Sequence, residues 1–195
     1  GGESNDIKYP GPSVNETSEY ITRDLNAGRF DFFCGGITIP SRKIESVRLL
    51  KKGSNGIEFF TSQVLYDGKK IKKMLKYYDD VCKENNVLPR RILLSFAPVS
   101  SKKNIDFLKW LGVEIPSQTE KRLTNKKTSM SDESLEIASE ILKGILNNNE
   151  KLGITVPIGL NVEHIMSYNF QSSINMLQEL SKIYREFCIK TSLYD

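Results

Sequence analysis

The sequence predicts an α/β protein with a parallel sheet, and two observations support this prediction. Apolar runs of strand length alternate along the chain with longer segments in which apolar residues recur at helical spacing. The strand-like runs are apolar almost throughout, which is typical of parallel strands with helices on both faces of the sheet. An open doubly wound sheet and a (β/α)8 barrel would both satisfy this pattern.

Four segments have the composition of strands: residues 30–39, 56–66, 90–99 and 154–161. This is about half of what a complete barrel needs, and the 195 residues fall short of the ~250 that a barrel usually takes. No glycine-rich dinucleotide fingerprint and no P-loop follows any of these segments. The pattern is that of one domain with its own core.

Helical spacing predicts six helices, over residues 13–26, 41–52, 67–84, 101–111, 131–147 and 172–189. Ser13 and Glu16 have the spacing of a capping box at the first of them. Asp67 and Ser131 are expected to cap the third and the fifth. Residues 112–130 are predicted to be irregular, with one turn near residues 118–123.

Composition argues against several classes of function. The net charge of +4 comes from scattered lysines, and no nucleic-acid-binding module is recognisable. No apolar run is long enough to span a bilayer. With three distant cysteines and one histidine, a metal site is not expected, and the cysteines are expected to be reduced in a cytoplasmic protein.

The residue with the clearest functional signal is Gln63. It lies at the carboxyl end of an otherwise apolar strand, where an amide costs free energy unless it is hydrogen-bonded. In a barrel of parallel strands, that end is where ligands bind. Gln63 therefore either pairs inside the fold or contacts a substrate.

Several segments, taken in order, carry a resemblance to a known family. They are FFTSQVLYD at residues 59–67, APVS at 97–100, FL at 107–108, GVEIP at 112–116 and GLN at 159–161. Together they resemble the second half of methylenetetrahydrofolate reductase. The resemblance implies the C-terminal half of a (β/α)8 TIM barrel, with residues 1–195 as one domain that holds strands five to eight.

The resemblance also implies a reaction. In this family FAD carries a hydride from NAD(P)H to 5,10-methylenetetrahydrofolate, which gives 5-methyltetrahydrofolate. The chain would then be the C-terminal half of such an oxidoreductase, inactive alone and a homo-oligomer when full length. Two alternatives remain: a folate- or flavin-binding homologue that acts with a partner protein, and a non-catalytic α/β scaffold.

The family's functional residues map onto eight positions. Glu3 corresponds to a catalytic aspartate, and Gln63 and Asn161 to positions that bind the folate substrate. The resemblance places FAD against Gly36, Thr38, Arg42, Glu45 and Lys52. Of these, Glu45 would contact the ribose of FAD, Lys52 its phosphate or ribose, and Arg42 would replace a histidine as a phosphate contact. After Asn161 the chain has Val162 and Glu163 where many members have an arginine.

Overall fold

A computed structural model describes residues 11–26, 28, 32–125 and 128–191. Its sheet contains β1 (Gly35–Thr38), β2 (Phe59–Ser62), β3 (Arg91–Phe96) and β4 (Ile158–Val162). The strands lie side by side in chain order, and each neighbouring pair is parallel. The predicted α/β class with a parallel sheet is confirmed. A doubly wound sheet reverses its strand order at a switch point, whereas this consecutive order is the one that half of a (β/α)8 barrel has.

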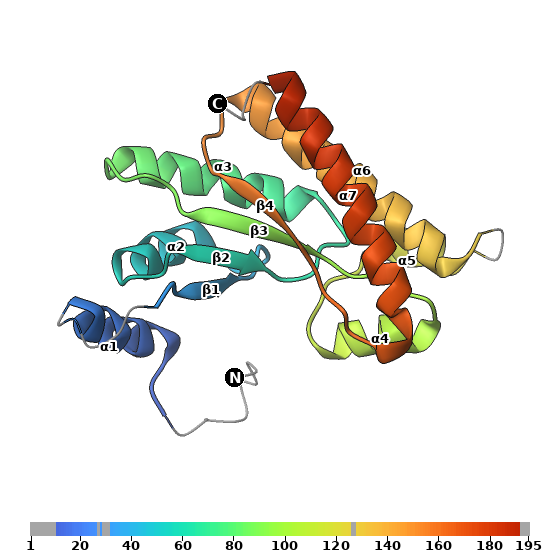
Figure 1. Cartoon of the computed structure of the whole chain (residues 1–195), viewed down its shortest axis with the longest axis horizontal. Helices are drawn as coiled ribbons and strands as arrows, with labels where there is room; N and C mark the ends of the chain where they lie inside the picture. The colour runs from blue at the N-terminus through green and yellow to red at the C-terminus, as the bar shows by residue number, and fades with distance from the viewer. Residues whose placement is uncertain (1–10, 27, 29–31, 126–127, 192–195) are drawn as a thin grey trace.

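Helices precede, connect and follow the strands along the chain (Figure 1). They are α1 (Val14–Asn26), α2 (Glu45–Ser54), α3 (Lys69–Glu84), α4 (Lys102–Trp110), α5 (Ser117–Leu123), α6 (Met130–Leu152) and α7 (Phe170–Thr191), with a 3-10 turn, η1 (Ser167–Asn169), before α7. In Figure 1, α1 lies near the amino ends of the strands and α4 near their carboxyl ends.

One face of the sheet carries the main hydrophobic core. Phe60, Ile92 and Ile158 are in register on neighbouring strands and therefore point to the same side. They form one buried cluster with side chains from α2, α3, α6 and α7, among them Leu49 and Leu142. A second cluster, around Val99 and Leu108, lies between the carboxyl ends of the strands and helices α4 and α5. The two clusters fix the position of the carboxyl edge, where sequence analysis predicts ligands.

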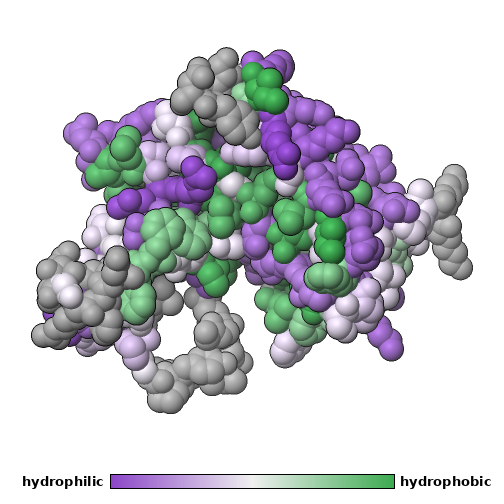
Figure 2. Space-filling view, in the orientation of Figure 1, coloured by the Kyte–Doolittle hydropathy of each residue, from purple (hydrophilic) through white to green (hydrophobic). Residues whose placement is uncertain are grey.

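The other face of the sheet is more open than the sequence predicted. Ile37 is 65% exposed there, while Phe59 and Leu93 are half-buried. Figure 2 shows hydrophobic residues gathered at the centre of the molecule on this side. Of the two arrangements that the sequence pattern left open, this open face fits the barrel, whose strands carry helices on one face only. An apolar run does not distinguish a helix-covered face from a face that lines a barrel interior.

Several predicted boundaries shift by a few residues. Residues 40–44 form turns, and Ile44 has a left-handed backbone with φ of 54°, so α2 begins at Glu45 instead of Ser41. Helix α6 begins at Met130, because the Ser129 side chain accepts the Asp132 N–H at 3.1 Å. The predicted cap at Ser131 was wrong by two residues.

The other predictions of where helices begin are confirmed only in part. The capping box of Ser13 and Glu16 is confirmed, with hydrogen bonds of 3.2 and 2.7 Å. Asp67 accepts the Lys69 N–H at 3.2 Å, but the N-cap position of α3 is Gly68. Residues 112–130, predicted to be irregular, contain the two-turn helix α5.

Candidate functional site

Polar side chains form a row along the carboxyl edge of the sheet, and we call Gln63, Ser95, Asn161 and Glu163 the edge row. Ser95 lies opposite Asn161 in the β3–β4 register, and the Asn161 amide donates to the Ser95 hydroxyl at 3.0 Å. The Ser95 N–H in turn donates to the Ser62 hydroxyl at 2.9 Å, which ties β3 to the residue before Gln63. Strands are spaced ~4.8 Å apart, so Gln63 and Asn161 are separated by roughly 10 Å across the sheet.

Gln63 itself is half-buried and held by one hydrogen bond. Its amide nitrogen donates to the Gly112 carbonyl at 3.0 Å, while its backbone N–H donates to the Thr38 carbonyl at 2.8 Å. Gly112 follows α4 with a φ of +81°, a conformation that glycine adopts readily. Within the described residues, the amide oxygen has no hydrogen-bond partner. The side chain is therefore oriented by the fold and keeps an acceptor and one donor hydrogen for a ligand.

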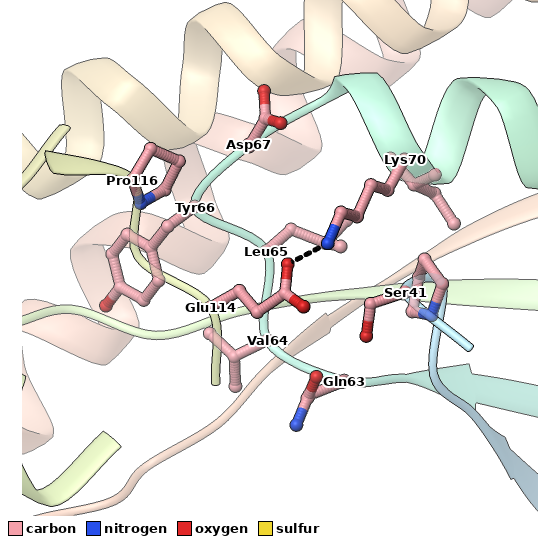
Figure 3. Close-up of a pocket in the computed structure, with 11 residues that line it drawn as sticks. Ser41, Gln63, Val64, Leu65, Tyr66, Asp67, Lys70, Glu114 and Pro116 are labelled. Atoms are coloured by element: carbon pink, nitrogen blue, oxygen red, sulfur yellow. Dashed lines mark hydrogen bonds and ion pairs between the residues drawn. The ribbon is translucent and has the colours of Figure 1, made fainter. Parts of the chain in front are cut away.

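A shallow hollow of about 50 Å³ adjoins Gln63. Figure 3 shows the Lys70 and Glu114 side chains pointing toward each other in an ion pair at its border. Pro40, Ser41 and Lys70 also line a larger groove of about 640 Å³ between α2 and α3. The hollow is too small for a pterin ring, so a ligand at Gln63 would lie on the open edge rather than inside an enclosed pocket.

Three of the predicted FAD contacts, Thr38, Glu45 and Lys52, lie close together at the carboxyl end of β1. We call them the β1 cluster. The Thr38 hydroxyl and the Ile39 N–H each donate to Glu45 Oε1 at 3.1 Å. Lys52 Nζ donates to the Ile37 carbonyl at 2.8 Å and lies 3.9 Å from Glu45 Oε1. Glu45 is 2% and Lys52 7% exposed. Glu45 Oε2 is buried and has no hydrogen-bond partner in the described chain.

The other two predicted FAD contacts lie nearby in different surroundings. Arg42 is half-buried and lines the α2–α3 groove, together with Glu45 and the aromatic ring of Tyr77. Gly36 does not open space for a ligand: a Cβ there would lie 3.0 Å from Ile57 and 3.1 Å from Phe60. The structure therefore accounts for this glycine by strand packing.

Glu163 is a site residue to which sequence analysis gave no role. It follows β4, and its N–H donates to the Phe96 carbonyl at 2.8 Å, so the strand pairing continues past Val162. Burial raises the pKa of its carboxyl group, and a hydrogen bond with Ser95 opposes that shift only in part. Burial and the nearby Glu163 charge also raise the pKa of Tyr66, whose hydroxyl donates to the Ala97 carbonyl at 2.8 Å.

Several other expectations can be placed on the structure. Glu3 lies outside the described residues. His164 is exposed, with its ring edge-to-face against Phe170 at 5.3 Å. Cys34, Cys82 and Cys188 are free thiols. Among the described residues there is no group of three histidine, cysteine or acidic side chains that could hold a metal ion. None of the described helices is long and apolar enough to cross a membrane.

Comparison with solved structures finds a similar protein of known ligand. The chain is similar to the solved structure of an uncharacterized protein from Clostridium thermocellum that binds two copies of 5-methyl-5,6,7,8-tetrahydrofolic acid. The two share 25% sequence identity with a TM-score of 0.71 over 85% of this chain. The match covers 58% of the other chain, so this chain spans less than two thirds of its neighbour's length. No protein-family model matches the chain, and no curated protein matches it significantly.

Proposed function

We propose that this chain binds a reduced folate at the carboxyl edge of its sheet. The observation that carries the proposal is the edge row, in which the half-buried Gln63, Asn161 and Glu163 and the buried Ser95 lie at strand ends of an otherwise apolar sheet. The folate-binding structural neighbour supports the choice of ligand. The roughly 10 Å between Gln63 and Asn161 suits a flat heterocycle laid across the strand ends.

In this proposal Gln63 recognises the pterin ring. An amide presents a donor and an acceptor side by side, which matches the edge of a pterin. The hydrogen bond to Gly112 holds the side chain in place, so binding costs little conformational entropy. Asn161 supports the site from two strands away and fixes the Ser95 hydroxyl.

As a finer proposal, the bound folate is the substrate of a flavin-dependent methylenetetrahydrofolate reductase that uses NAD(P)H. FAD, when bound, would supply the hydride carrier between nicotinamide and folate. The unpartnered Glu45 Oε2 fits a hydrogen bond from a ribose hydroxyl, and Arg42 could meet a phosphate in the α2–α3 groove. Lys52 is almost fully buried, and its ammonium group donates to the Ile37 carbonyl and lies 3.9 Å from Glu45 Oε1.

The burial of Lys52, which keeps its ammonium group away from a ligand on the surface, favours a second candidate, a folate-binding homologue that acts with a partner protein and without its own flavin. Absorbance near 450 nm of the purified chain separates the two candidates, since a retained flavin colours the protein yellow. A flavin-loaded protein supports the reductase. A colourless protein that binds folate supports the second candidate, and a colourless protein that binds none is a scaffold.

Calorimetric titration with 5-methyltetrahydrofolate tests the folate site directly. We expect Gln63→Leu to weaken binding by about ten- to a hundredfold, because the buried edge of the ligand then lacks its partner. Gln178→Leu, on an exposed position of α7, is the matched control and should bind as the unaltered chain does. Equal affinity of the Gln63 and Gln178 variants would remove Gln63 from the site.

A further inference from the structure

A second cleft lies at the amino end of β4, away from the edge row. It has a volume of about 680 Å³ and is bordered by the carboxyl halves of α6 and α7 and by the segment that leads into β4. Its walls are mainly apolar, with Leu146, Val156, Ile158 and Phe187 among the side chains that line it. A cleft of this size and composition is typical of sites for small molecules. We call it the α6–α7 cleft.

Asn149 lines the α6–α7 cleft with a side chain that the fold leaves unpaired. The residue is 8% exposed, and its Oδ1 and Nδ2 atoms are both buried without a hydrogen-bond partner in the described chain. Its backbone is fixed, because its carbonyl accepts the Ile154 N–H at 3.0 Å. The large majority of buried polar side-chain atoms in proteins are paired, and an unpaired one destabilises the fold. A partner for this amide must therefore come from outside the described chain.

The hydroxyl groups of the same walls already have partners. The Tyr184 hydroxyl donates to a carbonyl of β4 at 2.7 Å, and the Thr191 hydroxyl donates to the backbone of α7 at 2.9 Å. The Thr155 hydroxyl donates to Asp79 Oδ1 at 2.7 Å. Among the side chains that line the cleft, the Asn149 amide is thus the one that offers a buried donor and a buried acceptor to a ligand.

We propose that the α6–α7 cleft binds a small neutral molecule with an apolar body and a carboxamide or lactam edge, and that Asn149 recognises this edge. Such an edge presents one donor and one acceptor side by side, which is the complement of the asparagine amide. The χ2 torsion of asparagine is broad, so the amide can turn toward a ligand in the cleft that it lines. Arg91 and Glu150, the charged residues of the lining, are exposed, so an ionised group would find no buried partner inside.

The experiment is an NMR titration of the ¹⁵N-labelled chain with two probes of equal size. Benzamide has an apolar ring and a carboxamide, and acetophenone has the same ring and carbonyl but no N–H donor. We expect benzamide to shift the backbone signals of residues that line the α6–α7 cleft. It should bind about tenfold more tightly than acetophenone, because acetophenone leaves Asn149 Oδ1 without a donor.

Variants of α6 test whether Asn149 causes this preference. Asn149→Leu keeps the approximate size of the side chain and removes both polar atoms. It should weaken benzamide binding by about tenfold and leave acetophenone binding no weaker, so that the preference disappears. Asn148→Leu is the matched control, since Asn148 Nδ2 is also buried without a partner in the described chain but the residue does not line the cleft. This variant should keep the preference.

Each outcome decides the proposal. Benzamide that shifts no signals at the α6–α7 cleft of the unaltered chain overturns the site. Equal affinity for benzamide and acetophenone overturns the role of Asn149, and so does a preference that survives in Asn149→Leu or is lost in Asn148→Leu. If Asn149→Leu does not fold, the comparison of the two probes on the unaltered chain still decides. Folate binding is a separate question, because the edge row lies at the opposite end of the strands.

Discussion

The β1 cluster and the edge row contain similar residue types but use their hydrogen bonds differently. In the β1 cluster, Thr38 and Lys52 direct their donors at Glu45 and at the backbone of β1, and Glu45 and Lys52 are almost fully buried. In the edge row, Gln63 and Glu163 are half-buried and keep hydrogen-bonding capacity that no described residue uses. The first arrangement stabilises the fold, and the second is available to a ligand.

The position of Lys52 shows why the β1 cluster matters for the fold. Thr38 directs its carbonyl to β2, so the alternating Ile37 carbonyl points away from β2, to the side of β1 that pairs with no other strand of the described residues. Lys52 donates to that carbonyl and compensates part of the Glu45 charge. An edge strand with a satisfied carbonyl offers fewer groups to a foreign strand.

The largest effect is expected from Lys52→Ala, which leaves the Glu45 charge buried without compensation. Breaking a buried pair from one side typically costs about 3–5 kcal/mol of the free energy of unfolding. Urea denaturation measures the loss. The double variant Glu45→Gln with Lys52→Met should recover much of it, because neither side chain then carries a charge. A loss under about 1 kcal/mol for Lys52→Ala would mean that the pair stabilises the fold no more than an exposed ion pair does.

The sequence located the elements well because their apolar patterns are local. The apolar runs identified all four described strands, and helical spacing identified α1 to α4, α6 and α7. The exact start of α2 was not predictable, because a left-handed conformation at the β-branched Ile44 is rare and has no local sequence signal.

The candidate site was predictable only in part. Placing Gln63 and Asn161 at one edge follows from parallel pairing, which brings the carboxyl ends of strands together. Glu163 was given no role because its place at the carboxyl edge depends on the pairing of β3 with β4, two strands that are far apart in the chain. The hydrogen bond from Lys52 to the Ile37 carbonyl was likewise not predictable, because a lysine near a helix end is usually exposed and nothing in the sequence indicates that this one is buried.

A smaller effect is expected from Asn161→Ala in the edge row. It removes the hydrogen bond to Ser95 and should lower the free energy of unfolding by about 1 kcal/mol. Because Asn161 lies in the proposed folate site, folate affinity should fall as well. Ser95→Ala is the companion variant and removes the same hydrogen bond from the other side. A stability loss as large as that of Lys52→Ala would mean that the edge row supports the fold in the same way as the β1 cluster.

The smallest effect is expected from Glu114→Gln, which breaks the ion pair with Lys70 beside Gln63. Both side chains are more than half exposed, and exposed pairs of this kind contribute about 0–1 kcal/mol. We expect a change in the free energy of unfolding near the lower end of that range, and a smaller one at high salt. Folate affinity is the sharper readout, because the pair borders the hollow next to Gln63. If the ion pair is only a solvated contact at the surface, the affinity for folate stays the same. If Lys70 is instead released to meet the acidic tail of a folate, Glu114→Gln strengthens binding, and the edge available to the ligand extends from the strand ends to the start of α3.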